Sequence, residues 1–153
     1  MSGSKLSGFR VASDKPFLIG LGVLGGSYLL IIGAMVLADV VFLTAMPPRH
    51  RQVRRNLLSR HGFDYPMIAT EAAKGPAVRA LHGERPQPLA FVDDIFTNLQ
   101  SVRKHAPDTR LVNLMANQTF RALAPHPGEG VEIAADWPHA EELIRTHFAS
   151  LKA

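Results

Sequence analysis

Residues 17–38 read FLIGLGVLGGSYLLIIGAMVLA, a run of 22 positions without a charged side chain. A helix of this length would be about 33 Å long at about 1.5 Å per residue, slightly more than a bilayer core of about 30 Å. We therefore predict a transmembrane helix at 17–38, preceded by a polar tail at 1–16 and followed by a globular domain at 39–153. The alternative is a buried strand and helix of a soluble core. A cleaved signal peptide fits less well, because the run is too long and no small-x-small cleavage site follows it.

Glycines within this run suggest a contact surface. Gly22 and Gly26 are four residues apart and Gly33 lies two turns further along, so a helix would place them on nearly the same face. Small residues at this spacing let membrane helices approach closely, which predicts other transmembrane helices of a membrane complex as partners. The simpler interpretation is that glycine is tolerated in lipid.

The net charge of +4 is unevenly distributed. Arginines without an intervening acid follow the apolar run, at Arg49, Arg51, Arg54, Arg55 and Arg60, whereas residues 61–153 contain 9 basic and 11 acidic residues. The positive-inside rule then predicts a single-pass protein of the bacterial inner membrane with its domain in the cytoplasm. The first four of these arginines would anchor the chain at anionic lipid headgroups, or simply form the solvated face of a helix. A nearly neutral domain argues against nucleic-acid binding.

The rest of the chain alternates short apolar runs with helical patterns, which is typical of an α/β domain with a small parallel sheet. The cysteine count is zero, which excludes disulfides and thiol chemistry. Strands are expected at 40–45, 67–69, 89–92, 111–115 and, as an edge strand, 131–134. Helices are expected at 48–61, from 71 or 74 to 82, at 98–105, 119–123 and 138–151.

Polar side chains with chemical potential stand where these elements begin or end. Thr44 lies near the end of the first of these strands, Lys74 opens a helix, and Asp93 and Asp94 follow the strand 89–92. The carboxyl edge of a parallel sheet is where open α/β folds bind ligands, so a hydroxyl, a lysine and two carboxylates there suit a phosphate and magnesium site. Taken singly, each of these residues is as well explained by a cap, a turn or a solvated side chain.

The order and spacing of these residues are more specific. The segments ADVVFLTAMPPRHRQVRRNLLSRHGFDYPMIATEAAKGPAVRAL and PLAFVDDIFTNLQSVRKHAPDTRLVNLMA resemble the second half of the haloacid dehalogenase-like (HAD) hydrolase core. The resemblance implies a Rossmann-like domain in which Thr44 and Lys74 contact a phosphoryl group. It further implies that Asp93 and Asp94 help to hold Mg²⁺.

The chain departs from that family at its start. HAD phosphohydrolases begin with a strand ending in Asp-x-Asp, which supplies the nucleophile and the general acid and base, and the chain contains no such motif. Laying residues 16–26 on that strand places Gly20 and Gly22 at the two aspartate positions. Covalent catalysis then has no first step and the metal loses a principal ligand.

These observations support two main hypotheses. The first is a non-catalytic accessory subunit of a membrane complex that needs no cofactor and uses a HAD-like domain as a cytoplasmic docking surface. The second is a Mg²⁺-dependent phosphohydrolase with residual activity, or one completed by an aspartate of another chain. A third interpretation is a truncated or fused gene product. The seven histidines show no pair at the helical spacing of metal ligands, so a zinc site is not expected.

Overall fold

The computed structural model describes residues 17–20, 38–115 and 117–151. Within them, six parallel strands form one sheet in the order β3-β2-β1-β4-β5-β6. The strands are β1 (Phe17–Gly20), β2 (Asp39–Ala45), β3 (Met67–Thr70), β4 (Leu89–Asp93), β5 (Arg110–Leu114) and β6 (Val131–Ala134). The helices are η1 (Pro48–His50), α2 (Arg51–Arg60), α3 (Lys74–His82), α4 (Phe96–His105), α5 (Gln118–Leu123) and α6 (Trp137–Ser150). The α/β class predicted for the domain is confirmed.

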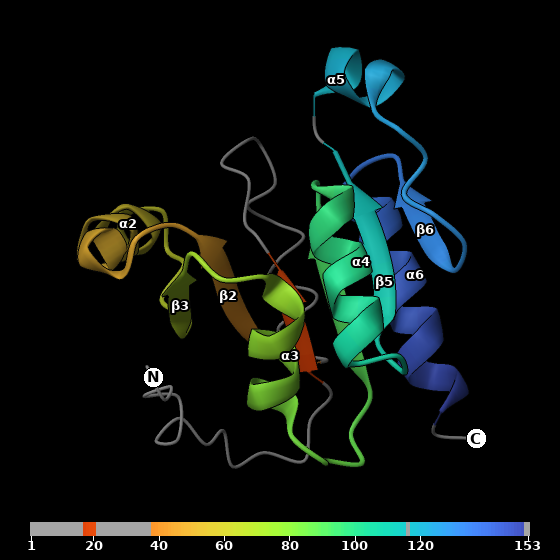
Figure 1. The fold of residues 1–153 in the computed structure, drawn as a ribbon, viewed down its shortest axis with the longest axis horizontal. Coiled ribbons are helices and arrows are strands. Elements are labelled where there is room, and N and C mark those ends of the chain that lie inside the picture. Colours follow the sequence, from red (N-terminus) through yellow and green to blue (C-terminus); the bar gives the residue numbers. More distant parts are fainter. Residues whose placement is uncertain (1–16, 21–37, 116, 152–153) are drawn as a thin grey trace.

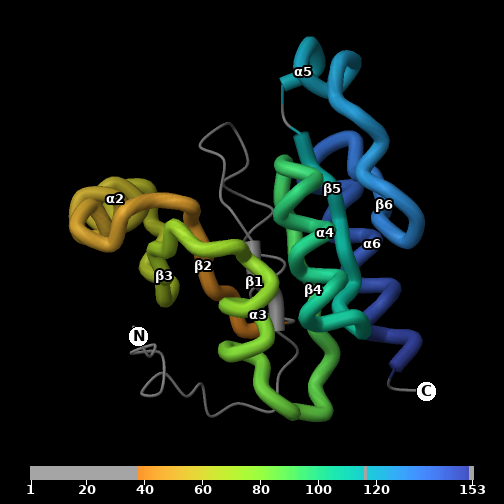
Figure 2. The backbone as a smooth tube through the Cα atoms, viewed as in Figure 1, coloured from red at the N-terminus to blue at the C-terminus, as the bar shows by residue number. Residues whose placement is uncertain are grey.

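Helices cover both faces of the sheet (Figure 1). Strand side chains alternate between the faces, so Val41 and Leu43 of β2 pack with α3 and α4, whereas Val40 points to the opposite face. On that opposite face α6 covers the half around β4, β5 and β6, and α2 packs with Phe42 near β3. The chain path in Figure 2 shows the same layers, with α3 and α4 side by side in front of the sheet.

The predicted transmembrane helix is wrong. Phe17–Gly20 is a strand in the middle of the sheet, with Ile19 in register with Val41 of β2 and Phe91 of β4. In the parts of the chain that the structure describes, every helix is too short or too polar to cross a bilayer. The predicted single-pass topology and cytoplasmic domain orientation therefore lose their basis. The rest of the apolar run, residues 21–37, lies outside the described residues.

The error has a physical reason. An all-parallel sheet is covered by helices on both faces, so its inner strands read as nearly continuous apolar runs rather than as an alternating pattern. Such a run followed by a second apolar segment has the composition of a membrane span. The strand part of the alternative interpretation, a buried strand and helix of a soluble core, agrees with β1, whereas its helix part falls outside the described residues.

The other elements lie close to their predicted positions, because their local signals are strong. The carboxylate of Asp136 caps α6 by accepting a hydrogen bond from the backbone N–H of His139 at 2.9 Å. Gly62 ends the α2 segment with a positive φ of 79°, as expected for a C-terminal cap. Most differences are one or two residues at the ends, such as the start of α4 at Phe96 rather than Asn98.

The helices α3 and α4 meet at unusually short range. A Cβ atom on Gly75 would lie 2.0 Å from the backbone oxygen of Ser101, so only glycine fits at this position. The backbone N–H of Gly75 donates to the Ser101 hydroxyl at 3.0 Å. This contact fixes the first turn of α3, and thereby Lys74, relative to α4.

Candidate functional site at the carboxyl edge of the sheet

The structure brings Thr44, Lys74 and Asp93 to the carboxyl edge of the sheet. Thr44 is the sixth residue of β2, Asp93 is the last residue of β4, and Lys74 is the first residue of α3. All three are buried. Since β1 lies between β2 and β4, its last residue, Gly20, ends at the same edge, in register with Phe42 and Val92. The sequence prediction that these residues share one edge is therefore correct.

Lys74 is the central cation of this edge. Only 1% of its surface is exposed, and it is among the largest fully buried side chains in the described residues. Its ammonium group donates a hydrogen bond of 2.6 Å to the backbone oxygen of Leu43. Burial lowers the pKa of Lys74 to about 8, although the negative charges of Asp93 and Asp94 act in the opposite direction. The ammonium form therefore still predominates at neutral pH.

The carboxylate of Asp93 is held by its own helix start. It accepts hydrogen bonds from the backbone N–H of Ile95 at 2.8 Å and from the amide of Asn98, at 3.0 Å to Oδ1 and 3.2 Å to Oδ2. Burial raises the pKa of Asp93 above its usual range; these hydrogen bonds and Lys74 lower it, and Asp94 raises it further. Asp93 is thus a carboxyl group held in one position within electrostatic range of Lys74.

Asp94 is placed differently from its neighbour. Its Oδ1 atom is buried and has no hydrogen-bond partner. It lines a cavity of about 200 Å³ together with Asn113, Met115 and apolar residues of the β4–α4 connection and of the segment after α5. The Oδ1 atom of Asp94 is therefore available to accept a hydrogen bond from a ligand.

Two asparagines of the site were not singled out in the sequence. Asn98 positions the Asp93 carboxylate, and Asn113 of β5 donates to the backbone oxygens of Asp93 and Asp94, each at 3.2 Å. The sequence contained a signal for Asn113, because it is a polar residue within the apolar run LVNLM. Strands covered on both faces are mostly apolar, and a buried polar side chain in one needs a hydrogen-bond partner. Asn98 gave a weaker signal, since asparagine is common near helix starts.

The resemblance implies a magnesium ion, and the described residues do not make a complete site for one. They contain no group of three histidine, cysteine or acidic residues able to surround a metal ion. The oxygens of Asp93 are already hydrogen-bonded, and Gly20 brings no carboxylate to the end of β1. Mg²⁺ keeps several waters and is usually bound through one or two carboxylates and substrate phosphates, so Asp94 is the residue of this edge best placed to contact such an ion.

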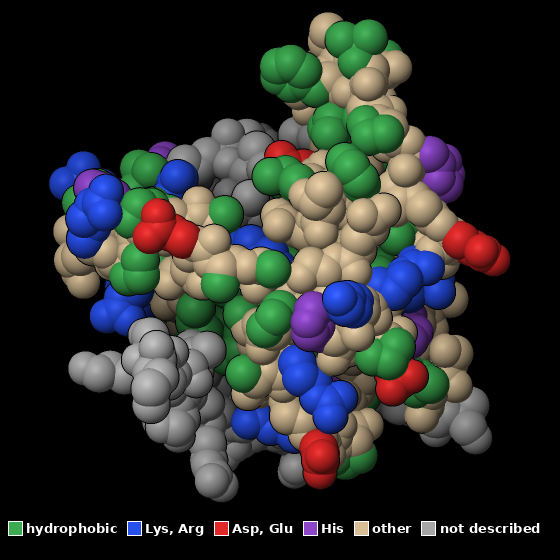
Figure 3. Space-filling model, viewed as in Figure 1, with side chains coloured by type: hydrophobic (Ala, Val, Ile, Leu, Met, Phe, Trp, Pro, Cys, Tyr) green, Lys and Arg blue, Asp and Glu red, His purple; other side chains and the backbone are tan. Residues whose placement is uncertain are grey.

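The other predicted site residues are not part of this edge. Gly22, Gly26 and Gly33, predicted to pack against another helix, lie outside the described residues. Arg49 lies in η1, and Arg51, Arg54 and Arg55 lie on α2, at the β3 end of the sheet (Figure 1). Their predicted role next to a membrane span is not supported, because the strand β1 occupies the beginning of that span. These arginines lie on η1 and α2, whose residues are mostly exposed, and Figure 3 shows Lys and Arg side chains gathered at this end of the molecule. This agrees with the simpler interpretation, the solvated face of a helix.

The chain matches no family model, no curated protein and no solved structure in comparisons with known proteins.

Proposed function

We propose that this chain is a non-catalytic HAD-like domain that binds a phosphate-bearing ligand at the carboxyl edge of its sheet. One observation carries the proposal. The edge keeps a buried hydroxyl and a buried ammonium group at Thr44 and Lys74, whereas Gly20 has no side chain at the end of β1. Groups suited to holding a phosphoryl group are therefore present next to a position that cannot attack phosphorus.

The ammonium group of Lys74 is the charge at this edge that attracts an anion, whereas the carboxyl groups of Asp93 and Asp94 act against one. Keeping a lysine charged in a buried position is costly, and here the nearby charges of Asp93 and Asp94 offset part of that cost. A bound phosphate would add negative charge close to the ammonium group and would stabilise its charged form further. Charge-assisted hydrogen bonds of this kind contribute about 1.5–3 kcal/mol each.

A Mg²⁺-dependent phosphohydrolase is the second candidate. It is favoured by the unpartnered Oδ1 atom of Asp94, which is free to accept a contact from a ligand or an ion. This activity would need a nucleophile from another chain, because glycine cannot form a covalent intermediate.

The two candidates are separated by measuring binding and turnover on the same protein. Binding of inorganic phosphate would be followed by calorimetry with and without Mg²⁺, and turnover with p-nitrophenyl phosphate. We expect binding without turnover. Thr44→Val and Lys74→Met should weaken binding at least tenfold, corresponding to about 1.4 kcal/mol or more.

The matched control is Lys104→Met, because Lys104 is an exposed lysine at the end of α4. It should leave phosphate binding unchanged. Turnover that disappears in Asp94→Asn would favour the phosphohydrolase instead. If phosphate binds equally well to the wild type, Thr44→Val and Lys74→Met, or does not bind at all, the proposal is wrong.

A further inference from the structure

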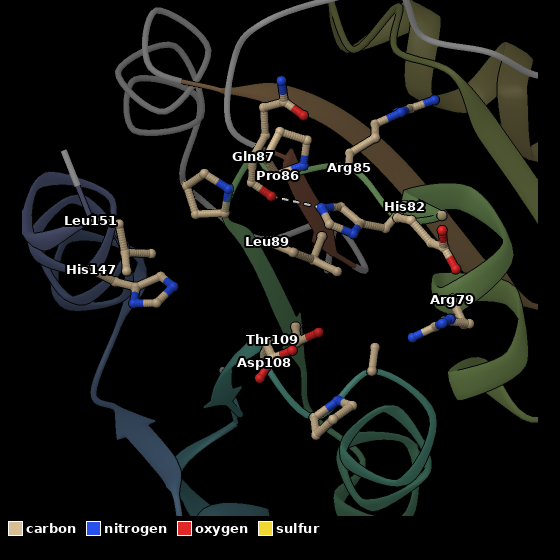
Figure 4. Close-up of a pocket in the computed structure, with 15 residues that line it drawn as sticks. Arg79, His82, Arg85, Pro86, Gln87, Leu89, Asp108, Thr109, His147 and Leu151 are labelled. Atoms are coloured by element: carbon tan, nitrogen blue, oxygen red, sulfur yellow. Dashed lines mark hydrogen bonds between the residues drawn. The ribbon is translucent and has the colours of Figure 1, made fainter.

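A second cavity lies at the opposite, amino-terminal edge of the sheet. It has a volume of about 540 Å³ and opens beside the start of β4, between the last turn of α3, the turn before β5 and the end of α6 (Figure 4). This volume falls in the range of about 300–1,000 Å³ that is usual for small-molecule sites. Thr44 and Lys74 do not line it, so it is separate from the site described above.

Several buried polar atoms on the cavity wall lack a hydrogen-bond partner, and one of them is the side-chain oxygen of Gln87. Thr109 is 8% exposed and its hydroxyl oxygen has no partner, and the Nε2 atom of His147 is likewise buried and unpaired. Figure 4 shows the His147 ring, on α6, facing across the cavity toward the strand on which Leu89 lies. Buried polar groups are nearly always hydrogen-bonded, so the wall offers positions that a ligand could fill: an acceptor on Gln87, and two groups that can donate, on Thr109 and His147.

A positive charge accompanies these two groups. Arg79, in the last turn of α3, extends its guanidinium group toward the side of the cavity where Thr109 lies (Figure 4). Burial and the charge of Arg110 lower the pKa of His147, against the opposing effect of Glu132, so its ring is neutral at pH 7. A neutral imidazole donates through Nε2 in one of its tautomers, and threonine and arginine also donate. Three donors therefore face one space.

The rest of the wall limits the size and charge of the ligand. Apolar surface is supplied by Leu89, Ala106, Pro107 and Leu151. Glu84 and Asp108 also line the cavity, but they are exposed side chains at its rim, where a second negative charge on a ligand would be repelled. Arg85 lines the cavity as well, but its side chain extends away from Thr109 and His147 (Figure 4). The wall thus combines an anion-binding group with apolar surface, and the two carboxylates at its rim act against a second negative charge on a ligand.

We propose that this cavity binds a small organic monocarboxylate, whose carboxylate accepts hydrogen bonds from Arg79, Thr109 and His147 and whose apolar body packs against Leu89 and Pro107. Arginine is the side chain best matched to a carboxylate, because its fork of N–H groups holds both oxygens.

Ligand binding would be measured by NMR titration of the full chain with benzoate and hexanoate, with benzamide as the neutral isostere and inorganic phosphate as the competing anion. We expect both carboxylates to bind at the cavity, and benzamide to bind at least tenfold more weakly than benzoate. Equal binding of benzoate and benzamide would overturn the proposal, and so would the absence of binding. Phosphate binding at this cavity in preference to the carboxylates would also overturn it.

Variants locate the contacts. Arg79→Gln and Thr109→Val should each weaken benzoate binding at least fivefold. The matched controls, Arg60→Gln in the last turn of α2 and Thr119→Val on α5, should leave benzoate binding unchanged. Wild-type affinity in Arg79→Gln, an exposed position whose change leaves the core intact, would refute the assigned contacts. Lys74→Met should also keep benzoate binding, which separates this proposal from the phosphate site.

Discussion

Replacing Lys74 by methionine should change the way in which the stability of the protein depends on pH. Methionine fills a similar space without the ammonium group, so the variant loses the titration of a buried lysine. The pKa of Lys74 is about 8 in the folded chain and 10.5 as an ordinary value. Between these values the unfolded chain holds the proton more tightly, so the unfolding free energy of the wild type rises with pH.

The difference between these two pKa values of Lys74 corresponds to about 3 kcal/mol of unfolding free energy, taking about 1.4 kcal/mol for each pKa unit. We therefore expect the wild type to gain about 3 kcal/mol relative to Lys74→Met between pH 8 and pH 10.5, with no such change from pH 6 to pH 7. Urea unfolding followed by circular dichroism at a series of pH values measures this difference. The control Lys104→Met should follow the wild-type profile. Parallel pH profiles for the wild type and Lys74→Met would refute the reasoning.

Three further substitutions examine the fold around the site. Gly75→Ala should destabilise the protein by about 1–3 kcal/mol, because the new Cβ atom would meet the backbone of Ser101. Ser101→Ala should cost only about 1 kcal/mol, because it removes one hydrogen bond. Equal losses of stability for the two variants in thermal melts would contradict this packing. Ile19→Pro should abolish cooperative unfolding, because proline interrupts the hydrogen bonds of a strand that is paired on both sides. A melting curve like that of the wild type would show that the chain does not need β1 as a central strand.

The position of the carboxyl-edge site could be predicted from sequence because the carboxyl ends of parallel strands meet at one edge of the sheet. Once Thr44 and Asp93 are placed at strand ends, the sheet brings them to a common edge without any knowledge of side-chain contacts. The hydrogen bond from Lys74 to Leu43 could not be foreseen in the same way, since it depends on how closely α3 approaches α4 at Gly75.

The cavity beside Thr109 and His147 had no sequence signal. Its residues come from the end of α3, the start of β4, the turn before β5 and the end of α6, so no local spacing connects them. The apolar composition of residues 17–38 led to the wrong prediction of a membrane span at β1, because an apolar run indicates burial but not whether protein or lipid surrounds it. A strand between two other strands and a helix in lipid satisfy the same requirement.

The place of β1 in the sheet has a consequence for how the chain is made. β1 is synthesised before the other described strands, yet one of its edges stays open until β4 has been translated, because β4 is the neighbour on that side. During that interval an apolar strand edge faces the solvent, which is the kind of surface that promotes aggregation and recruits chaperones. Slow translation between β2 and β4 should therefore lower the yield of folded protein more than slow translation after β4.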